Sequence, residues 1–188
     1  TLSAKELIEI CKLLYVARRM KSYLGETHEE CEILKDIQEQ IITAKSVEDK
    51  INSCILSETE IADDASSELA AIRRKIRSLN GRTKEILDNM VRSAHYKKFL
   101  QDPIVTMRSD RYVIPVKSEY KGEVNGIVHD TSSTGATLFI EPMSVVQNNN
   151  EIRDLKNREQ IEIERILAEL SAVVAENGHT LFVDYRCI

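Results

Sequence analysis

Apolar side chains recur every three or four residues through most of this chain, which is the spacing of one face of an α-helix. In residues 1–63, two such stretches follow Ser3 and Thr27, and each of these residues is followed three positions later by Glu, forming a capping box. Gly25 is expected to end the first helix. Short amphipathic segments joined by brief loops predict a helical core bundle over residues 1–63.

Two longer apolar seams lie further along the chain. From Asp64 to Leu100, spacings of three and four alternate as in a heptad repeat. At about 1.5 Å per residue, such a helix would extend on the order of 54 Å. We therefore expect an outgoing arm helix at 64–100 and a return helix, with a truncated core segment, at 143–188. Gly81 inside the first seam indicates either a mild kink or a close approach of the partner helix. The expected seam positions are Leu69, Ile72, Ile76, Leu79, Thr83, Ile86 and Met90.

Between the seams, over residues 101–142, the apolar period changes to two, as in a half-buried strand. A hairpin turning at Ser109-Asp110 is expected, followed by a second pair of strands whose turn ends in Gly135, a residue suited to positive φ. Pro115 inside a strand predicts an edge position. The expected fold class is mainly α: a helical bundle with a long antiparallel coiled-coil arm and a small antiparallel β tip that leans on the arm helices.

Composition limits the kind of protein. The chain has 188 residues, of which 42% are hydrophobic and 30% charged, so it can bury a core. It has no apolar run long enough for a bilayer, and its first residues lack the order of a signal peptide, so a soluble, cytoplasmic protein is expected. The four cysteines are far apart and have no CxxC pairing, so we expect reduced thiols and neither a zinc site nor a disulfide frame.

Charge is unevenly distributed. Residues 65–121 hold 13 Lys/Arg against 6 Asp/Glu, whereas residues 1–64 hold 8 against 14 and residues 122–188 hold 5 against 11. On the helix, basic positions are typical of solvated coiled-coil flanks. In and beside the insert the basic residues have few acidic neighbours in the sequence, and clustered positive charge attracts phosphate backbones. The candidate nucleic-acid-binding residues are Lys97, Lys98, Arg108, Arg111, Lys117 and Lys121.

A catalytic interpretation of the insert is disfavoured. His129 and Asp130 lie close to Ser132 and Glu141 in the sequence, but adjacent strand residues point to opposite faces and cannot converge. The turn residues are better explained as hydrogen-bond partners of a tight turn. No catalytic residue is predicted.

Several strings in the chain carry a family resemblance. Arg111-Tyr-Val-Ile-Pro-Val-Lys117, Gly126-Ile-Val-His-Asp-Thr-Ser-Ser-Thr-Gly-Ala-Thr-Leu-Phe-Ile-Glu-Pro142 and Asn148-Asn-Asn-Glu-Ile-Arg-Asp-Leu155 closely resemble the MutS type-two family, the bacterial MutS paralogue without a mismatch-reading domain. Asp64 to Arg73 and Leu100 to Arg108 match it as well. The resemblance extends from Thr1 to about Glu176.

This resemblance implies a core, lever and clamp segment. Full-length members resemble dimeric ATPases that use ATP and Mg and carry a C-terminal nuclease domain. They are linked to DNA repair, to suppression of homologous recombination and, in some bacteria, to rescue of collided ribosomes through ribosomal RNA. This chain has no G-x-x-x-x-G-K-[ST] and no such nuclease domain, so the segment itself is expected to be neither an enzyme nor a cofactor site.

The implied partners are duplex or branched DNA, or the ribosome, with no membrane and with a second copy in the full-length protein. The alternative is a coiled-coil structural or protein-interaction arm that makes no direct contact with nucleic acid.

Overall fold

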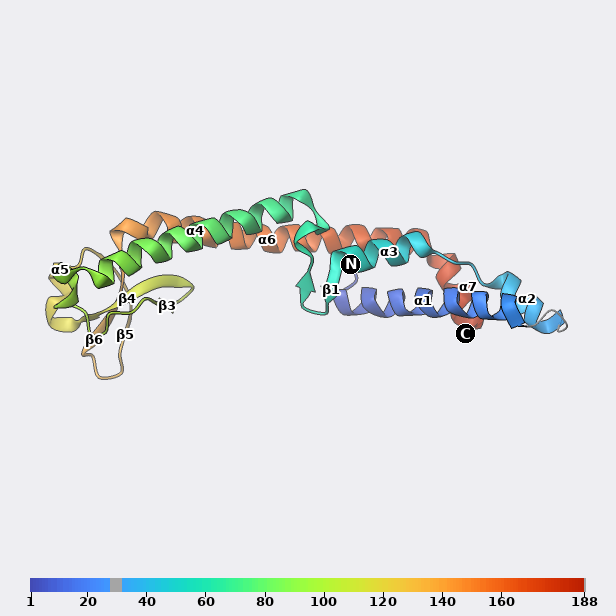
Figure 1. Ribbon diagram of the computed structural model, residues 1–188, viewed down its shortest axis with the longest axis horizontal. Coiled ribbons are helices and arrows are strands. Elements are labelled where there is room, and N and C mark those ends of the chain that lie inside the picture. Colours follow the sequence, from blue (N-terminus) through green and yellow to red (C-terminus); the bar gives the residue numbers. More distant parts are fainter. Residues whose placement is uncertain (28–31, 188) are drawn as a thin grey trace. The chain divides into compact units, whose positions relative to one another are not determined.

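The computed structural model describes residues 1–27 and 32–187 of the chain. These are mainly helical, with small antiparallel sheets, so the predicted fold class is confirmed. The elements, in chain order, are α1 (Ala4–Thr27), α2 (Glu32–Gln40), α3 (Lys45–Cys54), β1 (Ile55–Ser57), β2 (Glu60–Ile61), η1 (Asp63–Ala65), α4 (Ser67–Arg92), α5 (Ala94–Lys97), β3 (Thr106–Arg108), β4 (Arg111–Lys117), η2 (Ser118–Glu123), β5 (Gly126–Thr131), β6 (Thr137–Pro142), α6 (Met143–Glu176) and α7 (Gly178–Cys187) (Figure 1).

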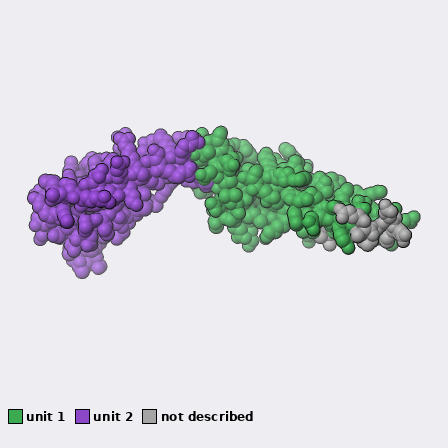
Figure 2. All heavy atoms as spheres, in the orientation of Figure 1, with its two compact units in different colours: residues 1–70, 160–188 green, residues 71–159 purple. Residues whose placement is uncertain are grey.

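The chain forms two compact units, coloured separately in Figure 2. Unit 1 comprises residues 1–70 and 160–188, and unit 2 comprises residues 71–159. The division falls inside α4 and inside α6, so each of these helices contributes residues to both units.

The start of α1 confirms the first capping box. The Ser3 amide donates to the Glu6 carboxylate at 2.7 Å, and the Glu6 amide donates to the Ser3 hydroxyl at 3.3 Å. The expected end at Gly25 is wrong, because α1 continues to Thr27. A Cβ at Gly25 would lie 2.8 Å from the Gln38 amide nitrogen, so the glycine permits close packing on α2 rather than a helix end. The partner of the second expected capping box, Glu30, lies outside the described residues.

Unit 1 is built around one apolar core to which α1, α3, the base of α4 and the C-terminal part of α6 all contribute. Its most deeply buried members include Leu7, Leu14, Ile51, Leu69 and Leu170. A partly buried ion pair also joins α1 to α3: Arg18 donates to both oxygens of Glu48, at 2.9 and 3.0 Å. Those bonds lower the pKa of Glu48. The hairpin of β1 and β2 was not predicted from the sequence pattern, which indicated only helices before residue 64.

The outgoing helix is shorter than expected. The pattern predicts one helix from Asp64 to Leu100, but α4 ends at Arg92 and the short α5 follows. Ser93 adopts an extended conformation and its hydroxyl accepts a hydrogen bond from the His95 amide, which ends one helix and begins the next.

Within unit 2, the Arg73–Glu159 ion pair (2.7 Å) and the Lys75–Glu151 ion pair (2.5 Å) link α4 to α6. Gly81 makes no close contact, since a Cβ there would meet nothing within 4 Å, and α4 continues through this position.

The sheet of unit 2 has the strand order β3-β4-β6-β5, and all its pairings are antiparallel. The predicted hairpin at Ser109-Asp110 is confirmed, with φ of 49° and 60° at the two positions, as a two-residue type I′ turn requires. Gly135 has the expected positive φ, 74°.

The predicted edge position of Pro115 is wrong, because β4 lies between β3 and β6. The carbonyl of Pro115 accepts a hydrogen bond from the Gln101 amide at 2.9 Å, on the side where β3 has already ended. The amide and carbonyl of a strand residue point to the same side, so the missing N–H of Pro115 faces away from β6 and costs no sheet hydrogen bond there.

One face of this sheet packs against the end of α4, as expected for a tip that leans on the arm helices. Ile114 and Val116 of β4 and Ile140 of β6 share a core with Leu87 and Val91 of α4. The remaining buried members are Phe99, Leu100, Val124 and Val145.

Gly126 provides a first test of the sheet. A Cβ at this position would lie 2.3 Å from the carbonyl oxygen of Glu141 and 2.6 Å from Cγ2 of Ile140. We expect Gly126→Ala to destabilise unit 2 by more than about 2 kcal/mol, well beyond an ordinary surface substitution, measured by urea unfolding. Gly81→Ala is the control, and it should stabilise the chain by about 0.5–1 kcal/mol because α4 has room for the methyl group. Equal effects of the two substitutions would contradict this packing.

Glu162 provides a test in unit 1. Its carboxylate accepts hydrogen bonds from Arg165 and from the Ser66 hydroxyl. These bonds lower the pKa of Glu162 to about 2, and the bond from Arg165 has the larger effect. Because the pKa of Glu162 is lower in the folded state than in the unfolded state, its ionised carboxylate stabilises the folded state at neutral pH. This stabilisation is lost as the pH falls from about 4.5 towards 2. The stability difference between wild type and Glu162→Gln should therefore be constant near neutral pH and shrink in acid. Urea unfolding across this range is the measurement, and a stability difference that stays constant into acid would contradict the lowered pKa of Glu162.

Candidate nucleic-acid interface

The six predicted basic residues separate into two groups. Lys97, Lys98, Lys117 and Lys121, called here the lysine corner, lie at the end of α5, the end of β4 and in η2. Arg108 and Arg111 lie instead at the β3–β4 turn, at the opposite end of β4.

Backbone pairing brings Lys98 and Lys117 of the lysine corner together. The Lys117 amide donates to the Phe99 carbonyl at 3.0 Å, which places the segment after α5 beside the end of β4. The Lys117 ammonium then reaches the Lys98 carbonyl at 3.5 Å. Residues almost twenty positions apart in the sequence thus share one surface.

The ammonium groups of the lysine corner are electrostatically unpaired. Within residues 1–27 and 32–187, none of the four forms an ion pair. Lys97, Lys98 and Lys121 are exposed, and Lys117 is half-buried. Glu119 and Glu123 of η2 are also exposed and offset part of this charge. The corner therefore presents positive charge to solvent, which is the requirement for contact with an anionic partner.

The two arginines form ion pairs with carboxylates that are distant in the sequence, at Asp130 and Glu141. Arg108 forms an ion pair with Asp130 at 3.3 Å, and its guanidinium lies 4.0 Å from the ring centroid of Phe139. Arg111 donates to the Glu141 carboxylate at 2.8 Å and to Asn150 at 2.7 Å. The sequence concealed these partners because they come from β5, β6 and α6, which are distant along the chain.

Glu141 is the centre of a buried polar network. Its side chain is fully buried, and besides Arg111 it contacts the His129 ring at 2.5 Å and accepts a hydrogen bond from the Asn149 amide at 2.8 Å. Asn149 also donates to the Tyr112 carbonyl at 3.2 Å. With these partners, the Glu141 side chain links β4, β5 and α6 to β6, and its role is structural.

The turn between β5 and β6 holds itself together, as the sequence predicts. The Asp130 carboxylate accepts from the Thr131 amide at 2.8 Å, and the Ser132 hydroxyl accepts from the Thr137 amide at 3.0 Å. His129 contacts Glu141 whereas Asp130 pairs with Arg108, so the two neighbours have different partners. The strand register shifts between Val128 and Asp130, so the simple alternation expected from the sequence does not hold at His129.

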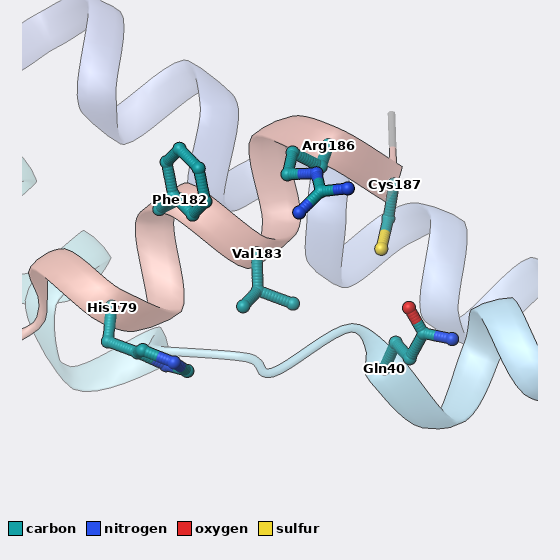
Figure 3. A pocket seen from close by; sticks show the side chains of 6 residues that line it. All are labelled: Gln40, His179, Phe182, Val183, Arg186 and Cys187. Atoms are coloured by element: carbon teal, nitrogen blue, oxygen red, sulfur yellow. The ribbon is translucent and has the colours of Figure 1, made fainter.

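The rest of the described chain bears on three other possibilities: a metal site, a membrane-spanning helix and a catalytic pocket. In residues 1–27 and 32–187, no group of three or more His, Cys, Asp or Glu side chains is arranged to hold a metal ion. No described helix combines the length and hydropathy needed to cross a membrane. A hollow of about 310 Å³ in unit 1, lined mainly by α7 with Gln40 of α2 opposite, contains no nucleophile activated by a base (Figure 3).

Curated proteins called Endonuclease MutS2 match nearly the whole chain. The protein of Alkaliphilus oremlandii is 48% identical over 175 residues, which are 92% of this chain and 22% of that protein. That of Clostridioides difficile is 49% identical over 184 residues, 96% of this chain and 23% of that protein. That of Clostridium perfringens is 47% identical over 189 residues, 100% of this chain and 24% of that protein. No protein-family model matches.

These matches place a chain with a basic surface and a structural polar core among the MutS-like proteins. More narrowly, it belongs to the MutS2 family, as a partial sequence that spans less than a quarter of the length of these relatives.

Arg111 can be tested as a structural residue. Arg111→Ala removes a partner from a buried carboxylate, so we expect it to destabilise unit 2 by about 3 kcal/mol. Arg153→Ala, at an exposed position of α6, should have little effect. Urea unfolding followed by circular dichroism compares the two. Equal stability of both variants would mean that the Glu141 network does not hold the sheet.

Proposed function

We propose that this chain is the nucleic-acid-gripping segment of a MutS2 protein, and that the lysine corner contacts the phosphate backbone of DNA without reading its sequence. The observation that carries the proposal is the group of four ammonium groups that have no ion-pair partner within residues 1–27 and 32–187. The name of the relatives supports it, since an endonuclease acts on nucleic acid chains.

The chemistry of the corner favours backbone contact. Lysine binds phosphate as a compact point charge, and contacts to phosphate carry no information about the base sequence. If all four lysines contacted phosphates, the logarithm of the affinity would fall with the logarithm of salt concentration with a slope of about −3.6. Binding of this kind is weak and depends strongly on salt. It suits a surface that supplements the contacts made by other parts of a larger protein.

In the whole protein, we propose that this segment acts as a lever and clamp. The support is that α4 and α6 each contribute to both units, so a displacement of residues in unit 1 is transmitted along continuous helices. The source of that displacement would be an ATPase elsewhere in a dimeric, cytoplasmic protein, using ATP and Mg. That part of the proposal rests on the family resemblance.

The lysine corner can be tested by removing charge. Lys117→Ala with Lys121→Ala should reduce the slope of the logarithm of duplex affinity against the logarithm of salt concentration by about 2 in magnitude. Each lysine that no longer contacts a phosphate reduces the number of counterions released on binding by about 0.9. The control pair is Lys5→Ala with Lys50→Ala, two exposed lysines of unit 1, and it should leave the slope unchanged. Fluorescence anisotropy over a salt series is the measurement.

The outcome separates the candidates. An unchanged slope in the Lys117 and Lys121 variant would reject the corner as the contact. No binding of naked DNA or RNA at moderate salt would favour the alternative of a protein-interaction arm. Binding to ribosomal subunits alone would point to the ribosome as the partner.

A further inference from the structure

Aromatic rings stand beside the ammonium groups of the lysine corner. The exposed His95 ring of α5 meets the rings of Tyr96 and Phe99 edge-on, with centroids 5.0 and 5.5 Å away. Phe99 contacts Tyr120 of η2 at 5.3 Å. Phe99 itself is only 4% exposed, so it fixes the outer rings and does not meet a ligand. His95 and the half-buried Tyr120 are the rings that solvent reaches.

Cations and rings are interleaved at this surface. The Lys98 ammonium lies 4.7 Å from the Phe99 centroid, and the Lys117 ammonium lies 6.0 Å from the Tyr120 centroid. Lys121 follows Tyr120 directly in the chain. Proteins that bind single-stranded nucleic acid use this combination, because phosphates bind the cations while unpaired bases stack on the rings. A continuous duplex uses the cations alone, since its base faces are already stacked on one another.

We infer that the lysine corner takes unpaired nucleotides in preference to continuous duplex, with bases against His95 and Tyr120 and phosphates against the lysines. This inference rests on the proposed function, because it assigns a ligand class to the same four lysines. Contact of this kind does not depend on sequence, since every base has a stacking face.

The acidic residues of η2 also favour a single strand over a duplex. Glu119 and Glu123 are exposed and flank Tyr120 and Lys121 in the sequence. Their carboxylates repel phosphates, and the repulsion is larger for a duplex, which carries phosphates on two strands.

The test compares strand with duplex. Anisotropy with the whole 188-residue chain would use oligothymidine, oligouridine and a DNA duplex, each about 20 nucleotides long, in the same salt. Charge alone favours the duplex, which has twice the phosphate density. We expect the single strands to bind about ten-fold more tightly, because stacking adds to the charge contact. The oligouridine arm shows whether DNA and RNA strands are both accepted.

Ring removal identifies the cause. His95→Ala and Tyr120→Leu should each weaken strand binding about ten-fold and leave duplex binding almost unchanged, since only unpaired bases stack. Leu keeps apolar packing against Phe99, and circular dichroism checks that the variant folds; if it does not, His95→Ala decides alone. His179→Ala, at an exposed histidine of α7, is the matched control and should change neither affinity.

The two proposals fail in different ways. A duplex that binds as tightly as the strands, or a strand-to-duplex ratio unaltered by His95→Ala, overturns the stacking inference. If lysine removal still weakens duplex binding in that case, the proposed function stands. If the wild-type chain binds none of the three nucleic acids, both proposals are overturned.

Discussion

A single buried carboxylate organises the sheet of unit 2. Glu141 receives Arg111 from β4, contacts His129 from β5 and accepts a hydrogen bond from Asn149 of α6. A lone carboxylate would be costly to bury, and these partners offset that cost only when three strands and the helix are all in place. The network therefore ties the strand register to α6, and the apolar face of the sheet then packs on α4.

The lysine corner depends on that arrangement. With β4 fixed between β3 and β6, its far end lies beside the segment after α5, and the Lys117 amide bonds to Phe99. The same strand thus has an arginine paired with a carboxylate at one end and, at the other, a lysine that forms no ion pair within residues 1–27 and 32–187. This division of labour explains why some basic residues of the insert serve the fold while others remain available to an anionic partner.

The two kinds of basic residue also match the chemistry of their side chains. The planar guanidinium of Arg111 bridges a carboxylate and an amide at once, and that of Arg108 covers the Phe139 ring while pairing with Asp130. The lysines keep compact, hydrated charges at the surface. Membership of the MutS2 family gives this surface a setting, because the same segment recurs in relatives named as endonucleases.

The sequence by itself determined the helical periodicity, the hairpin at Ser109-Asp110, the glycine at 135 and the family. All of these depend on neighbours in the chain or on matching strings. It could not show that Pro115 is tolerated in an inner strand, or which basic residues are paired. Those outcomes were decided by tertiary structure, because Glu141 and Phe99 meet β4 only once strands and loops far apart in the sequence lie side by side.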